Sequence, residues 1–171
     1  FKFKISPFRR LILMIIFLFL CIRLMSIEIL NIDIPFLSTL LGNNTFSSLF
    51  VLLCFLFIIN GANLIDGFNG LLAINLIIIN SILAYINLAD GINEFSIVII
   101  GQIIVLFSFL LFNFPSAKIF LGDSGSYLLG STVALNVIIT NNLNPDYSSF
   151  FFFTLLFYLF FVVFFFFFIN F

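Results

Sequence analysis

The chain has 171 residues, of which 64% are hydrophobic and 8% are charged, with a mean hydropathy of +1.37 and a formal net charge of −1. Soluble domains carry roughly 25% charged residues, and a soluble domain of this length could not bury so much apolar surface, so the composition indicates an integral membrane protein. The absence of an extended basic patch argues against a nucleic-acid partner. The chain has no histidine and its 2 cysteines lie in apolar runs, which excludes a zinc site.

Apolar runs of spanning length recur along the chain, since a membrane-spanning helix needs about 20 residues. They predict an all-α, polytopic helical bundle that forms a single integral-membrane domain over residues 1–171. A transmembrane barrel is disfavoured because the runs are too long and do not alternate. The predicted spans, six in number, are about 8–29, 45–62, 70–88, 95–113, 124–141 and 148–169.

The basic residues predict how this bundle is oriented. Arg23 lies near one face of the predicted bundle. The other basic residues lie on the opposite side: Lys2, Lys4, Arg9, Arg10 and Lys118. The positive-inside rule therefore places the N-terminal end in the cytoplasm, together with the loops at about 60–70 and 113–126. We expect these two loops to face the same compartment and to be able to form one site.

The first of these loops sets polar residues and glycines between two apolar runs, as Asn63-Leu-Ile-Asp66-Gly67-Phe-Asn69-Gly70. Asn63, Asp66 and Asn69 recur every three residues. If the preceding helix continued for one further turn, their side chains would lie on nearly the same face of that helix. Gly67 and Gly70 allow the helix to break or a ligand to approach the backbone closely. An ionisable residue at a membrane boundary is a functional-site hypothesis by default.

The second loop has the same character, with the sequence Pro115-Ser-Ala-Lys118-Ile-Phe120-Leu-Gly122-Asp123-Ser-Gly125-Ser126. Asp66 and Asp123, with the amide oxygen of Asn63, are hard oxygen ligands that suit Mg2+, with Mn2+ as the alternative. Spacing alone does not decide between metal binding and a simple helix-capping role for each carboxylate. The exposed N–H groups expected at Gly122 and the charge of Lys118 favour a phosphate-bearing ligand.

Both loops also match motifs of a known family. Asn63 to Leu71 fits the pattern N-x-x-D-G-(I/F/L)-(D/N)-G-L, and Phe112 to Ser126 is close to F-N-x-x-P-A-K-(I/V)-F-(M/L)-G-D-(S/T)-G-S. The chain thus resembles the polyprenyl-phosphate N-acetylhexosamine-1-phosphate transferases from about residue 5 to 140. It is more similar to the bacterial branch that begins surface-polysaccharide lipid intermediates. The resemblance implies a phosphotransferase that moves a sugar 1-phosphate, such as N-acetylglucosamine 1-phosphate, from a UDP-sugar to undecaprenyl phosphate and releases UMP.

The resemblance also implies which residues act on the metal and the reacting phosphates. Asp123 would be a Mg2+ ligand, and Asn63 would be a second contact to the metal or its phosphates. Asp66 would help to hold the nucleotide and the polar network of the site. Asp66 and Asp123 are therefore the expected catalytic residues.

A second set of residues is expected to bind the nucleotide. Gly67 and Phe120 would flank the uracil ring, since an aromatic face and a backbone without a side chain form a suitable slot. Asn69 would hydrogen-bond the uracil edge, because its amide offers both a donor and an acceptor. Lys118 would add a mobile positive charge near the phosphates.

The expected setting is the bacterial inner membrane, with the active site facing the cytoplasm and with a UDP-sugar, a polyprenyl phosphate and the bilayer as partners. A homodimer is left open. Two other functions also stay open: a UDP-N-acetylmuramoyl-pentapeptide phosphotransferase of peptidoglycan synthesis, and, in a different class, a membrane transporter or structural bundle. The family's Asp-Asp motif should precede Lys4 and its Arg- and His-rich loop should follow the last span. We therefore expect this chain to be a fragment that is inactive alone.

Overall fold

The computed structural model describes residues 6–30, 32–116, 118–149 and 152. The regular secondary structure in these ranges is helical, which confirms the all-α fold class. Of the predicted spans, 148–169 lies almost entirely outside the described residues. The helices are α1 (Pro7–Leu24), α2 (Pro35–Leu41), α3 (Asn44–Ile65), α4 (Leu71–Ala89), α5 (Asn93–Asn113) and α6 (Gly122–Leu143).

The helix ends differ from the predicted spans in ways that affect the two motifs. α1 ends at Leu24 rather than at residue 29, and α2 is a short helix inside a predicted loop. Pro35 begins α2, a position where its missing N–H costs nothing. α3 continues as far as Ile65 and α6 starts at Gly122, so parts of both motifs are helical rather than loop.

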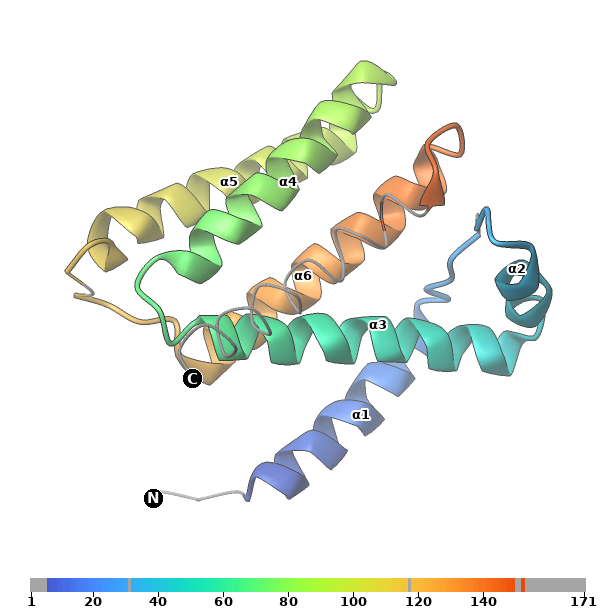
Figure 1. The fold of residues 1–171 in the computed structure, drawn as a ribbon, viewed down its shortest axis with the longest axis horizontal. Helices are drawn as coiled ribbons and strands as arrows, with labels where there is room; N and C mark the ends of the chain where they lie inside the picture. The colour runs from blue at the N-terminus through green and yellow to red at the C-terminus, as the bar shows by residue number, and fades with distance from the viewer. Residues whose placement is uncertain (1–5, 31, 117, 150–151, 153–171) are drawn as a thin grey trace.

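The helices pack so that the two motif loops meet at one end of the bundle. α4 and α5 lie side by side, α6 packs against α3 and α4, and α1 packs against α3. Figure 1 shows the turn between α3 and α4 and the loop between α5 and α6 at the same end, at the lower left. The start of α1 lies toward this end too. Segments far apart in the sequence thus converge on one region.

Three of the described helices, α3, α4 and α5, are long and apolar enough to cross a membrane. The chain is therefore a multi-pass membrane protein. α5 is the least covered of the three, with 17% of its apolar window buried against 56% for α3 and for α4. An apolar helix face of this kind is stable in bilayer hydrocarbon but not in water. That α1 and α6 also span remains a prediction, since α1 carries three arginines and α6 is rich in Ser, Thr and Asn.

Buried amides join α4, α5 and α6 along their length. The Nδ2 group of Asn136 donates to Asn80 Oδ1 at 3.0 Å and to Gln102 Oε1 at 2.6 Å. Further along the same interface, Asn87 Nδ2 donates to Thr140 Oγ1 at 2.9 Å. Hydrogen bonds between helices in an apolar interior fix which residues face one another. These hydrogen bonds fix how far α6 is shifted along α4, and so they fix where the first turn of α6 lies along the bundle.

A glycine allows α3 and α6 to approach closely. A Cβ added at Gly130 would lie 3.0 Å from the Ala62 Cβ and 3.1 Å from the Ile59 Cα. Small residues at such crossings let helix backbones come together in membranes. This contact lies one helical turn beyond Ser126, so it brings the last turn of α3 against the first turns of α6.

Candidate functional site

Asn63 connects the first motif to the second. Its Nδ2 donates to Asp123 Oδ1 at 3.0 Å and to Ser126 Oγ at 3.0 Å. Ser126 is fully buried, and its hydroxyl donates in turn to the Gly122 carbonyl at 3.1 Å. The amide of Asn63 is therefore fixed against the first turn of α6 on the side where the Asp123 carboxylate lies.

Arg10 brings a third element, α1, to the same carboxylate. Its Nη1 forms an ion pair with Asp123 Oδ2, and its guanidinium lies 5.7 Å from the centre of the Tyr127 ring. The hydrogen bonds from Asn63 and from Arg10, in that order, lower the pKa of the Asp123 carboxyl, so it stays ionised in water. Sequence reasoning used Arg10 only to orient the bundle. The signal that could have assigned it to the site was a cation on the same side of the membrane as both motif loops.

Asp66 lies at the C-terminal end of α3 and reaches across to α6. The backbone N–H of Gly122, at the start of α6, lies near this carboxylate. Partial burial raises the pKa of Asp66 by more than the Gly122 N–H lowers it, and the charge of Asp123 raises it further. Asp66 therefore lies beside the start of a helix that is distant in sequence. Asp123 does not cap α6, because it lies in the first turn with its carboxylate on Asn63 and Arg10.

Of the residues predicted to bind the nucleotide or its phosphates, Asn63 contacts this carboxylate pair, whereas Asn69, Lys118 and Phe120 make no hydrogen bond or ion pair with it in the described structure. α3 ends at Ile65, so Asn69 does not continue its helical face; its Nδ2 instead donates to the Pro115 carbonyl at 3.2 Å. Gly67, Phe120 and Lys118 are exposed. Within the described ranges, the Lys118 ammonium makes no hydrogen bond or ion pair and the Phe120 ring makes no stacking contact. No contact therefore joins Phe120 or Lys118 to the Asp66–Asp123 pair.

Asn113, which sequence reasoning did not assign to the site, joins the two motif loops. It is the last residue of α5 and is 3% exposed. Its Oδ1 accepts the Gly70 N–H, and its Nδ2 donates to the Ile119 carbonyl at 2.7 Å. It is the asparagine of the second family motif, but the motif alone does not show which groups its amide contacts. Only the folded backbone brings both of its partners within reach.

Gly70 has no room for a side chain, which gives a test of how closely the loops pack. Its φ is +74°, and an added Cβ would lie 3.1 Å from the side chains of both Leu110 and Phe114. Gly91 has nearly the same φ, +76°, but no atom lies within 4 Å of its added Cβ. We expect both Gly→Ala variants to lose about 1–2 kcal/mol from the left-handed backbone. Gly70→Ala should lose a further ~1–3 kcal/mol from overpacking.

Thermal unfolding of the two variants in the same detergent would measure this difference. If Gly70→Ala and Gly91→Ala have the same melting temperature, the loops are looser than the structure indicates.

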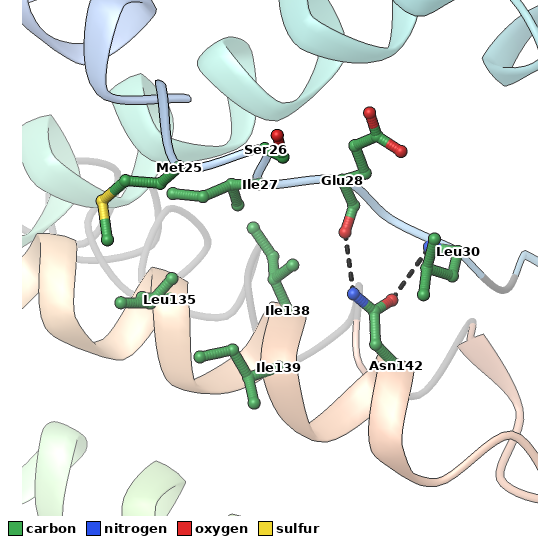
Figure 2. Close-up of a pocket in the computed structure, with 9 residues that line it drawn as sticks. All are labelled: Met25, Ser26, Ile27, Glu28, Leu30, Leu135, Ile138, Ile139 and Asn142. Atoms are coloured by element: carbon green, nitrogen blue, oxygen red, sulfur yellow. Dashed lines mark hydrogen bonds between the residues drawn. The ribbon is translucent and has the colours of Figure 1, made fainter. Parts of the chain in front are cut away.

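A separate pocket of about 300 Å³ lies between the segment after α1 and the aliphatic side of α6, away from both motifs (Figure 2). The Asn142 side chain closes it by donating to the Glu28 carbonyl at 2.7 Å and accepting the Leu30 N–H at 2.9 Å. The Glu28 carboxylate points away from the α6 side chains in Figure 2. No charged group therefore faces the aliphatic wall, and the pocket adds nothing to the motif site.

The oxygen atoms of the motif site fit Mg2+ better than a softer metal. Among the described residues, no group of three or more His, Cys, Asp or Glu side chains is placed to hold a metal ion. Mg2+ commonly takes only one or two carboxylates and completes its shell with waters and substrate phosphates. Asp66 and Asp123 lie close enough for the charge of one to affect the other. The two carboxylates and the amide oxygen of Asn63 are oxygen ligands of this type, and a Mg2+ site here stays a prediction.

The protein is thus a helical membrane protein in which two polar motifs form one site around a pair of carboxylates. The model of glycosyl transferase family 4 matches residues 2–141, and the chain belongs to this family. This confirms the resemblance found in the motifs.

Curated relatives match over shorter stretches. A phospho-N-acetylmuramoyl-pentapeptide-transferase from Leuconostoc mesenteroides is 44% identical over 82 residues, which is 47% of this chain and 25% of the relative. One from Clostridium perfringens is 33% identical over 109 residues, 64% of this chain and 34% of the relative. A Sulfolobus acidocaldarius protein, described provisionally as a UDP-N-acetylglucosamine–dolichyl-phosphate N-acetylglucosaminephosphotransferase, is 43% identical over 76 residues, 43% of this chain and 22% of the relative.

The chain thus matches about a quarter to a third of the length of these relatives. No solved structure matches it.

Proposed function

We propose that the chain forms the metal- and nucleotide-binding part of an enzyme that transfers an N-acetylhexosamine 1-phosphate from a UDP-sugar to undecaprenyl phosphate. The observation that carries this proposal is the contact of Asn63 with Asp123, which joins the two family motifs in one site. Membership of glycosyl transferase family 4 supports it.

In this proposal an oxygen of the acceptor phosphate attacks the β-phosphorus of the UDP-sugar. The bond from the β-phosphorus to the oxygen bridging the α-phosphate breaks, and UMP leaves with that oxygen. Asp66, Asp123 and the Asn63 amide oxygen would hold Mg2+, which when bound offsets the negative charge of the pyrophosphate. Arg10 lies beside Asp123 and would add a second positive charge for the phosphates.

The nucleotide would bind on the exposed side of the two loops. Phe120 is 63% exposed, and its ring would stack on the uracil with the Gly67 backbone on the opposite face. Asn69 would hydrogen-bond the uracil edge, although its amide also holds the Pro115 carbonyl. Lys118 has an unpaired ammonium in the described structure and would move to the phosphates.

The donor sugar has two candidates. The resemblance of the chain to the surface-polysaccharide branch favours UDP-N-acetylglucosamine. The names of the relatives from Leuconostoc and Clostridium favour UDP-N-acetylmuramoyl-pentapeptide instead. In either case the proposed lipid acceptor and the basic residues near the motifs support a reaction at the cytoplasmic face of a bacterial inner membrane.

The test is UMP release by the purified protein at its full genomic length. We expect release from one of the two UDP-sugars only when both undecaprenyl phosphate and Mg2+ are present. EDTA should stop the reaction, and added Mg2+ or Mn2+ should restore it. Release that persists in EDTA would contradict the metal site, and no release with either donor would contradict the transferase.

A further inference from the structure

Some buried asparagines form hydrogen bonds only within their own helix, and Asn113 differs from these. Asn75, for example, is 4% exposed and donates to the Leu71 carbonyl of its own helix at 2.7 Å. Asn113 instead bonds to two segments outside α5, one from each motif. It also does not cap α5, since the α5 cap is the Phe114 N–H on the Leu110 carbonyl. Its amide therefore serves the contact between the loops.

The two partners of Asn113 are backbone groups at sensitive points. The Gly70 N–H ends the turn that contains Gly67 and Asn69, and α4 has no side-chain cap at that point. The Ile119 carbonyl belongs to the peptide unit that leads directly into Phe120. One rigid amide thus sets the distance between the turn of the first motif and the backbone of Phe120.

Neighbouring bonds close the same region without replacing this connection. The Asn69 side chain reaches only the Pro115 carbonyl, before the bend of the second loop. The Lys118 N–H returns to the Phe112 carbonyl at 3.0 Å and so closes that loop on itself. Among the described residues, Asn113 alone joins the turn of the first motif to the peptide unit just before Phe120 by side-chain hydrogen bonds.

We propose that Asn113 is a positioning residue that holds the turn of the first motif and Phe120 at the separation needed to bind a uracil ring. Asn113 is buried with both polar atoms engaged, so it acts through the two backbones and does not touch the nucleotide. This inference rests on the proposed function, because it assigns the slot to the uracil of the UDP-sugar donor.

The test compares Asn113→Leu with Asn75→Leu in the full-length protein. Both variants remove a buried amide, but only Asn113→Leu frees the two loops. Losing both hydrogen bonds should raise the KM for the UDP-sugar roughly tenfold, which corresponds to about 1.4 kcal/mol. The KM for undecaprenyl phosphate should stay the same. Asn75→Leu should leave both KM values unchanged.

Asn113→Gln provides a second variant in case Asn113→Leu does not fold. It keeps the amide but moves it outward by one methylene, so the KM for the UDP-sugar should again rise while the melting temperature stays close to that of the wild type. Equal changes in both KM values, or none, would overturn the positioning role. If the wild type itself releases no UMP, the proposed function fails and this inference fails with it; if only the variants behave as wild type, the inference alone fails.

Discussion

Asp123→Asn should lower UMP release by about 10²–10³-fold, the size of effect seen when a group that stabilises charge in a transition state is lost. The asparagine has the same shape but no charge, so it is a poorer ligand for Mg2+. It also leaves Arg10 without its anionic partner. Asp123 is exposed in the structure, so the melting temperature should change little. A large loss of activity without a loss of stability would assign the carboxylate to the chemistry.

Asp90→Asn is the matched control for this experiment. Asp90 is an exposed acid at the C-terminal end of α4, at the other end of that helix from the motif turn. The substitution removes the same charge, so it should leave UMP release at the wild-type rate. Wild-type activity in Asp123→Asn, or an equal loss in Asp90→Asn, would contradict the role assigned to Asp123. The dependence of rate on Mg2+ should also shift to higher concentration in Asp123→Asn alone.

The sequence was sufficient to predict that the two motifs would form one site. The charge bias put both loops on one side of the membrane, and the Asn63–Asp123 hydrogen bond agrees with that arrangement. Composition and apolar run length predicted a helical membrane bundle, because a spanning chain must satisfy its backbone hydrogen bonds internally. These properties follow from local sequence patterns and from the membrane environment that the composition indicates.

Other features of the site depend on contacts between distant segments. The last turn of α3 and the first turn of α6 contain polar residues. Asn63 and Asp123 were therefore predicted in loops, but they lie in helical turns. The sequence predicted a metal-binding or capping role for Asp66, but not its place beside Gly122 at the start of α6, because Gly122 is far along the chain. Asn113 belongs to the second motif, but its partners Gly70 and Ile119 are known only from the fold that brings them together.

Gly130→Leu should cause the largest loss of stability among the substitutions considered. The added Cβ would meet the Ile59 Cα at 3.1 Å and the Ile58 carbonyl oxygen at 3.3 Å. These are backbone atoms, so no change of rotamer relieves the contact and α3 and α6 must move apart. Overpacking in a core costs about 1–3 kcal/mol and occasionally more, and we expect the upper end or above here. Separation of the helices should also break the Asn63–Asp123 contact and abolish UMP release.

Gly101→Leu isolates the effect of packing from that of helix propensity. Gly101 is likewise a glycine inside a long helix, α5, but no atom lies within 4 Å of its added Cβ. Leucine is a better helix former than glycine by roughly 1 kcal/mol, so this control should be neutral or slightly more stable. Melting curves and UMP release should be measured in parallel for both variants. Gly130→Leu should lose stability and activity, whereas Gly101→Leu should be as stable as the wild type or slightly more stable. If Gly130→Leu and Gly101→Leu have the same melting temperature, then α3 and α6 do not cross at Gly130. The site at their ends must then be held together in another way.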